Sequence, residues 1–296
     1  MRHSRPGVRT LPLLALVAGL AAAWPLAGRA ASPAGQAAPA QAAPAEAASA
    51  QAAPAPATAP SVGSKIWIGR EAEMEEYLRT APITKIEQVP IGVTKPRRAY
   101  FDGNGPIQRA AWKPLRPGMH GGFYDSYKSE IAAYELDKLL KLEMVPPTVE
   151  RKIDKETGAL VQWVENVKAW KITDPVAGPD ANAWNKQVVA MKMFDNLIGN
   201  GDRNQGNLLY DPLYNLILID HSRAFTSSKD LPMQLGRVWK DLWDRMQALT
   251  PEEVDTKVTP WLAGKGEAKA IFERREKMKK AIDKLIAEKG AGAMIN

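Results

Sequence analysis

Hydrophobic and polar residues follow a regular period only after about residue 63 of this 296-residue chain. Before that point the sequence holds one aromatic residue, Trp24, and one carboxylate, Glu46, so it has nothing large to bury. Between residues 64 and 296, which hold eight of the nine tryptophans, apolar residues recur at the spacings of strands and helices. We therefore expect one folded domain over 64–296.

The first half of this domain predicts a small antiparallel sheet with helices. A short apolar run at 65–68 favours a strand, and the Glu-rich segment 70–80 favours a helix, since acidic residues are stabilising in a first turn. A longer helix is expected over 126–142, where apolar residues recur at helical spacing. Strand-like runs separated by turn signals lie at 85–91, 97–101, 107–115, 144–149 and 159–164.

The second half predicts helices around one short hairpin. A helix over 183–198 runs into a polar loop at 199–207. Strand-like runs at 208–210 and 216–219 then form a hairpin. The remaining predicted helices lie at 231–249, after the capping box Thr250-Pro251-Glu252-Glu253, and at 266–289. The pattern as a whole indicates an α+β protein.

Residues 1–30 have the order of an export signal. Basic residues precede the apolar run 11–23, and small residues follow up to Ala31, where we expect cleavage. Residues 31–63 repeat Gln-Ala-Ala-Pro and predict a disordered Ala/Pro-rich linker. A membrane anchor is the alternative, but two prolines and many alanines make a weak span. The protein is thus expected to be exported, periplasmic or extracellular, with no stable membrane span after cleavage.

Composition and charge exclude several classes of function. The absence of cysteine excludes disulfide scaffolds, thiolate zinc sites, iron–sulfur ligation and a cysteine nucleophile. The net charge of +7 falls to +4 over residues 64–296, because four arginines and Glu46 precede them. This mild excess permits binding of a polyphosphate such as a nucleotide, but it does not indicate a nucleic-acid-binding protein.

Several polar residues of the domain occur in an order suited to phosphoryl transfer. Lys113 lies on a predicted strand, with Ala111 on the same face, where a small side chain leaves room for a flat ring. Asp202 and Asn207 lie five residues apart in a loop, and Asp220 ends the following hairpin. Phosphoryl transfer needs a carboxylate on the attacking hydroxyl, hard oxygen ligands for Mg²⁺ and a cation on the phosphates. The spacing matches the catalytic and metal loops of protein kinases.

Other interpretations of these residues are less specific. The simplest is that Asp202 and Asn207 only cap turns. The row Asp220-His221-Ser222 is a poor catalytic relay, because neighbours on an extended segment point to opposite sides. No two of the three histidines have zinc-ligand spacing. Arg203 and Arg223 are candidates either for phosphate contact or for bracing carboxylates.

Longer stretches resemble the secretory-pathway kinases of the Golgi casein kinase and four-jointed type. The similar stretches are 111–114, 130–140, 145–149 and 194–203. The series Gly-Asp-Arg, Asn and Ile-Asp-His between 201 and 221 also resembles phosphatidylinositol 3/4-kinases. The resemblance implies a bilobal protein-kinase-like fold, with a small antiparallel-sheet N-lobe at 64–166 and a helical C-lobe at 167–296.

The resemblance also implies roles for individual residues. Lys113 would hold the phosphates of ATP, and Glu130 would pair with Lys113 or touch the metal. Asp202 would be the catalytic carboxylate, and Asp220 with Asn207 would bind Mg²⁺ or Mn²⁺. The residues that would cover the phosphates from a glycine-containing turn are Gly92 and Thr94.

The sequence departs from the family pattern at several positions, including Asn204, which replaces a usual His. The Golgi kinases carry Glu where this chain has Asn207, as protein and lipid kinases do, and His221 replaces the usual Asn or Phe. We expect an ATP- and divalent-metal-dependent phosphotransferase that moves a γ-phosphoryl group to a hydroxyl of a protein, sugar or lipid. The alternatives are a catalytically silent kinase-like binding module, and transfer of another group such as AMP.

The signal prediction has a direct test. N-terminal sequencing of the exported protein should find a mature chain that starts near Ala31, because signal peptidase cuts after small residues that follow an apolar run. An intact Met1 or Arg2 on the exported protein would instead establish an uncleaved anchor.

Overall fold

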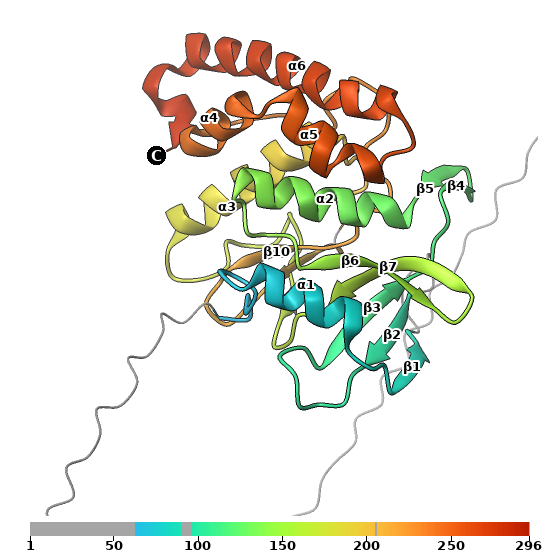
Figure 1. The fold of residues 1–296 in the computed structure, drawn as a ribbon. Helices are drawn as coiled ribbons and strands as arrows, with labels where there is room; N and C mark the ends of the chain where they lie inside the picture. The colour runs from blue at the N-terminus through green and yellow to red at the C-terminus, as the bar shows by residue number, and fades with distance from the viewer. Residues whose placement is uncertain (1–62, 90–95, 205, 296) are drawn as a thin grey trace, which may run out of the picture. The chain divides into compact units, whose positions relative to one another are not determined.

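The computed structural model describes residues 63–89, 96–204 and 206–295. The N-terminal half of its fold contains a five-stranded antiparallel sheet (Figure 1). Its strand order is β1-β2-β3-β7-β6. The strands are β1 (Lys85–Gln88), β2 (Arg97–Tyr100), β3 (Arg109–Lys113), β6 (Thr148–Ile153) and β7 (Glu156–Gln162). Strands β1 to β3 confirm the predicted meander, and the β6–β7 hairpin joins it where β7 pairs with β3.

Strand β3 presents its side chains to two different environments. Trp112 is buried in an apolar cluster with Met74 and Leu78. Ala111 and Lys113 lie on the opposite face, as strand alternation predicts, with Ala111 paired across the ladder to Val161. The alternation therefore places the candidate lysine away from the core that holds β3 in position.

Helices α1 (Glu71–Thr80) and α2 (Tyr127–Leu140) pack on opposite faces of this sheet. Helix α1 lies on the face of Trp112, and α2 packs Ile131 against the face of Ala111. Helix α2 also contacts the C-terminal helices, so it lies between the sheet and the helical part of the molecule (Figure 1). Such a helix, covered on two sides, accounts for the many buried positions along its sequence.

A two-stranded hairpin, β4 (Gly118–His120) and β5 (Phe123–Asp125), connects β3 to α2. From the sequence, Gly118, Gly121 and Gly122 predict only a loop here. The two central residues, Gly121 and Gly122, both have positive φ angles, of 58° and 89°. Positive φ at both central positions is the requirement of a type I′ hairpin turn, and a Gly-Gly pair meets it without steric cost.

The helical part of the molecule surrounds a second core. Its elements include β8 (Lys168–Ala169), α3 (Ala181–Ile198), β9 (Leu208–Tyr210), β10 (Leu216–Leu218), β11 (Val238–Trp239), α4 (Lys240–Ala248), α5 (Pro251–Lys257), η1 (Thr259–Trp261), α6 (Lys265–Lys289), η2 (Gly290–Ala293) and β12 (Met294–Ile295). Strands β8, β9 and β10 form one small sheet, and β11 pairs with β12. Thr250 and Glu253 form the predicted capping box at the start of α5.

The structure corrects the sequence prediction at three places. Residues 65–68 form turns rather than a strand, because the Ile68 N–H donates to the Lys65 carbonyl within the segment and Gly69 turns the chain at φ 74°. The strand expected at 144–149 begins only at Thr148, after two prolines that cannot donate to a ladder. The helix expected at 231–249 begins only at Lys240, since the preceding stretch contains Pro232 and Gly236.

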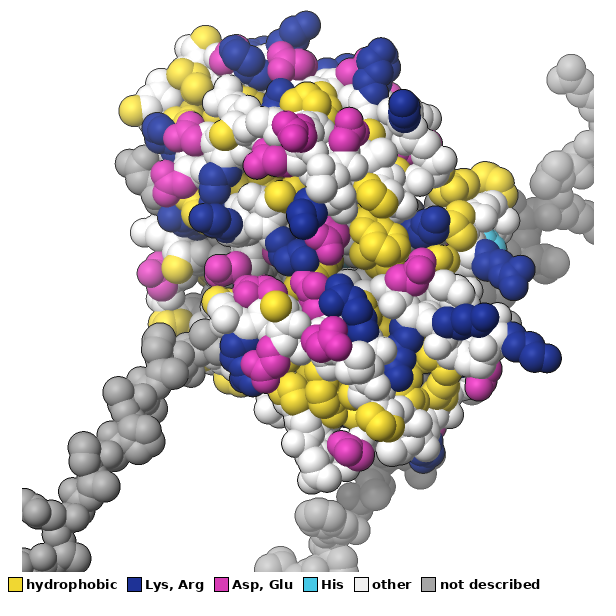
Figure 2. Space-filling model, in the orientation of Figure 1, with side chains coloured by type: hydrophobic (Ala, Val, Ile, Leu, Met, Phe, Trp, Pro, Cys, Tyr) yellow, Lys and Arg dark blue, Asp and Glu magenta, His cyan; other side chains and the backbone are white. Residues whose placement is uncertain are grey.

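The surface over α4 to α6 mixes both signs of charge, as Figure 2 shows for the face turned to the viewer. In exposed ion pairs such as Lys240–Asp244 and Lys279–Asp283, the two partners are four residues apart, about one helical turn. Among the residues that the structure describes, no helix is both long enough and apolar enough to cross a membrane.

The position of β3 should depend on Trp112. Replacing Trp112 with Ala should lower the free energy of unfolding by about 3–5 kcal/mol, because the side chain is 1% exposed and its removal leaves a cavity. Urea denaturation followed by circular dichroism measures the change. Leu213→Ala is the control, since Leu213 is 50% exposed and its loss should change the stability by about 0.5 kcal/mol or less. Equal effects of the two substitutions would contradict the assigned core.

Candidate active site

A cleft of about 750 Å³ lies where the five-stranded sheet meets the loops that follow α3 and β10. The apolar residues that line it include Val89, Pro96, Ala111, Val161, Val164, Val167, Leu209 and Ile219. The polar residues that line it include Lys113, Asp202, Asn207, Asp220 and Arg223. One part of the cleft can therefore accept a flat apolar ring, and the other part carries charges suited to phosphates.

The buried end of the cleft is organised by Lys113. Its Nζ atom lies 2.6 Å from Glu130 Oε1 and 2.9 Å from Asp220 Oδ1. Burial lowers the pKa of Lys113, but the charges of Asp220 and Glu130 outweigh it and raise that pKa above its usual value. Burial likewise raises the pKa of Glu130, and the Lys113 charge helps hold it well below its usual range. Lys113 and Glu130 are therefore both charged at neutral pH.

Asp220 reaches Lys113 through a strained backbone. It directly follows Ile219, beyond the end of β10, and adopts φ 61°, the left-handed region that non-glycine residues rarely occupy. The next backbone N–H, that of His221, donates to Glu130 Oε2 at 3.0 Å. This hydrogen bond fixes the turn and aims the Asp220 carboxylate into the cleft. Strained residues of this kind concentrate at functional sites.

Arg203 holds the loop after α3 in place. Its side chain is fully buried and pairs with Asp195 through two hydrogen bonds of 2.8 Å. It also donates to the carbonyl oxygens of Asn207 and Ile219, at 3.0 and 2.7 Å. A further donation goes to His221 Nε2 at 2.9 Å, and burial together with the Arg203 charge lowers the pKa of His221 and favours its neutral form. Arg203 thus braces backbone and carboxylates, one of the two roles left open above.

Arg223 also braces carboxylates, at the mouth of the cleft. Its Nη1 atom lies 3.1 Å from Asp202 Oδ2, and its Nε atom lies 3.0 Å from Asp125 Oδ1. The guanidinium also stacks over the ring of Phe123 at 4.2 Å from the centroid. Arg223 therefore neutralises Asp202 and links it to the end of β5.

The remaining predicted residues divide into two groups. Asn207 donates from Nδ2 to the Asp202 carbonyl at 3.2 Å, and its Oδ1 takes part in no hydrogen bond within the described part of the chain. Together with Asp220 it offers hard oxygen atoms of the kind that Mg²⁺ and Mn²⁺ prefer. Gly92 and Thr94 lie outside the described residues. Within 63–89, 96–204 and 206–295 there is no group of three or more His, Cys, Asp or Glu that could hold a metal.

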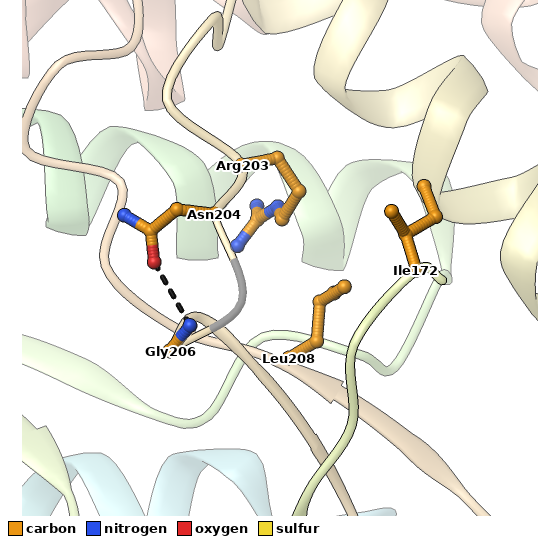
Figure 3. Close-up of a pocket in the computed structure, with 5 residues that line it drawn as sticks. All are labelled: Ile172, Arg203, Asn204, Gly206 and Leu208. Atoms are coloured by element: carbon orange, nitrogen blue, oxygen red, sulfur yellow. Dashed lines mark hydrogen bonds between the residues drawn. The ribbon is translucent and has the colours of Figure 1, made fainter. Parts of the chain in front are cut away.

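A second cavity, of about 550 Å³, adjoins the same loop. It is lined by Ile172, Arg203, Asn204, Gly206 and Leu208, which Figure 3 draws as sticks. Asn204 Oδ1 accepts from the Gly206 backbone N–H at 2.9 Å, so this side chain closes the turn rather than facing a ligand. Asn204 and Gly206 also line the large cleft, and the loop is thus one wall of both cavities.

Sequence reasoning missed two carboxylates of the site. Asp195 lies in the buried face of α3, and Asp125 ends a hairpin that was expected to be a loop. The signal for Asp195 was present in the sequence, because a charge within the apolar run Met191 to Ile198 requires a buried partner. No sequence spacing indicates the pairing of Asp125 with Arg223, since the two residues are 98 positions apart.

The fold and the cleft together define a bilobal, protein-kinase-like protein. No family model matches the sequence, and no curated protein matches it. Two solved structures with this fold are the Golgi casein kinase with Mn/ADP bound and Fam20 from hydra with sugar. The first has 15% identity and a TM-score of 0.57, over 76% of this chain and 78% of that one. The second has 18% identity and a TM-score of 0.59, over 76% of this chain and 91% of the hydra chain. The chain resembles these secretory-pathway kinases, as its motifs indicated.

Lys113 should make the stability of the protein depend on pH. In the wild type, the depressed pKa of Glu130 adds stability above about pH 4.5 that is lost as the pH falls. In Lys113→Met, burial of Glu130 without its cation raises that pKa, so ionisation of Glu130 destabilises the fold as the pH rises. Lys113→Met should therefore cost about 3–5 kcal/mol at pH 7, and the cost should shrink below about pH 4.5.

Urea denaturation of both proteins between pH 3 and 8 measures this difference. Lys85→Met, which removes an exposed lysine from the edge strand β1, is the matched control and should show little effect at any pH. A cost of Lys113→Met that stays constant over the whole range would show that Glu130 is not its electrostatic partner.

Proposed function

We propose that this protein is a phosphotransferase that moves the γ-phosphoryl group of ATP to a hydroxyl group, with Mg²⁺ or Mn²⁺ as cofactor. The observation that carries the proposal is the Lys113 ammonium, held within 3 Å of both Glu130 and Asp220 at the end of an apolar cleft. This arrangement supplies a fixed cation beside an apolar ring pocket. The likeness in fold to the Golgi casein kinase, solved with Mn/ADP bound, supports the same assignment.

Binding of the nucleotide follows from the two parts of the cleft. Ala111 and Val161 are paired across β3 and β7 and line the apolar part, where the base would stack. Lys113 would contact the phosphates, oriented by Glu130. Gly92 and Thr94, which follow β1 in the sequence, are proposed to cover the phosphates.

The donor atoms fit a hard divalent cation. The Asp220 carboxylate and the Asn207 amide oxygen would hold it, and the phosphates would complete its shell, as is usual for Mg²⁺ at nucleotide sites. When bound, the cation neutralises charge that develops on the transferred group. A site of two protein ligands plus phosphates agrees with the absence of a larger carboxylate cluster in the described residues.

Asp202 is the proposed catalytic carboxylate. Its side chain is 40% exposed and lines the cleft, so an acceptor hydroxyl can reach it. Its role is to orient the hydroxyl and to accept its proton as the new O–P bond forms. Arg223 holds the Asp202 carboxylate in position through their 3.1 Å contact. The acceptor class is a protein, sugar or lipid, and the proposed location is outside the cytoplasm, after removal of residues 1–30.

Two substitutions separate nucleotide binding from chemistry. Asp220→Ala should weaken binding of ATP·Mg²⁺ by roughly tenfold or more, because it removes a ligand of the bridging metal. Asp202→Ala should leave the binding constant within about threefold and reduce turnover by roughly 10²–10⁴-fold, because it removes only the base. Calorimetric titration with ATP·Mg²⁺ and a coupled ADP-release assay measure the two quantities. Asp244→Ala, at an exposed position of α4, is the control.

The alternatives predict different results in the same assays. A silent binding module would show no ADP release by the wild type, and AMP transfer would release pyrophosphate instead of ADP. The phosphotransfer proposal fails if Asp220→Ala binds ATP·Mg²⁺ as well as the wild type, or if the wild type binds ATP only without metal.

A further inference from the structure

The β4–β5 hairpin exposes an unusual set of apolar side chains. Met119 is 69% exposed, Phe123 is 56% exposed and Tyr124 is 38% exposed. Met119 and Phe123 are more exposed than the other large hydrophobic residues of the described chain. Apolar side chains gathered in this way on a surface mark a site of interaction.

The segment 115–124, which carries these residues, has a basic side chain and no acidic one. The sequence contains no acidic residue between Gly103 and Tyr124. Arg116, just before β4, is exposed and forms no ion pair within the described residues. Asp125, which ends β5, is 1% exposed and already paired with Arg223. Figure 2 shows hydrophobic side chains over this hairpin and Lys and Arg side chains below it on the same edge of the view.

The hairpin is joined directly to the candidate active site. Phe123 lies under the Arg223 guanidinium, which in turn holds both Asp125 and Asp202. Only the Arg223 side chain therefore separates Phe123 of the hairpin from Asp202 at the mouth of the cleft.

We propose that the β4–β5 hairpin docks on an anionic lipid surface. Met119, Phe123 and Tyr124 would enter the boundary between headgroups and acyl chains, while Arg116 would be attracted to lipid phosphates. A lipid surface is favoured over a polypeptide partner for two reasons. The exposed segment is free of acidic side chains, as an anionic surface requires. No hairpin residue lines either cavity described above, so the apolar side chains protrude and do not form a groove for a peptide.

A single fluorescent probe tests this docking in the full chain. Because the sequence contains no cysteine, Met119→Cys can be labelled at one position with an environment-sensitive nitrobenzoxadiazole dye. Vesicles of phosphatidylcholine with phosphatidylglycerol should increase the emission at least about twofold and shift it to the blue, as the dye leaves water. Vesicles of phosphatidylcholine alone should have little effect. The added substitution Arg116→Glu should raise the lipid concentration needed by on the order of tenfold.

The matched control is the same dye on Leu213→Cys, which is similarly exposed but lies in the β9–β10 turn. Its emission should not respond. The probe reports contact at the hairpin itself, whichever other segment also binds the vesicle. No nucleotide is present, so the result is independent of the proposed phosphotransfer.

Three results would overturn the proposal. If anionic vesicles do not change the emission of the dye at position 119, the hairpin does not bind lipid and a polypeptide partner becomes the better explanation. An equal response at positions 119 and 213 would mean non-specific adsorption. If the dye emission changes with protein concentration in the absence of lipid, the hairpin instead forms a contact between two copies of the chain.

Discussion

The cleft depends on a buried cation that no single part of the chain can stabilise. Lys113 comes from β3, Glu130 from α2, and Asp220 follows β10, so the ion pairs of 2.6 and 2.9 Å join segments up to 107 residues apart. Removing one buried partner lowers the stability of the fold by several kcal/mol, because the charges of the remaining partners are then uncompensated. The sheet, α2 and the β10 turn are therefore held in one arrangement. The same contacts leave the Asp220 carboxylate at the cleft surface, where it can also meet a ligand.

A second buried network makes the loop after α3 equally rigid. Arg203 is satisfied by Asp195, two carbonyl oxygens and His221, and none of these groups faces solvent freely. Asp202 lies next to this network but outside it. Its side chain is 40% exposed and is held by Arg223 alone among the ion pairs of the described chain. The structure thus combines a buried, fully paired interior with a more open mouth of the cleft.

Much of the fold was predictable because local patterns and tertiary packing agree. Helices α1, α2, α3 and α6 and the strands of the meander lie close to their predicted ranges. The failures have local causes. Pro232 and Gly236 prevent the first part of the expected helix at 231–249, and residues 65–68 form turns in which the Ile68 N–H donates to the Lys65 carbonyl. The Gly-Gly hairpin at 121–122 was readable from its turn chemistry, but its short strands lack the alternating pattern of a strand.

Residue type and spacing along the chain were enough to select the main polar groups of the candidate site. Lys113, Asp202, Asn207 and Asp220 were selected by residue type and spacing, and all four line one cleft. The contacts of Arg203 and Arg223 became visible only in the folded protein, which pairs Arg203 with Asp195 and Arg223 with Asp125 and Asp202. The physical reason is that strand alternation and turn spacing act over a few residues. The pairing of buried charges is decided by which distant elements pack together, because a buried ion is stable only beside its counterion.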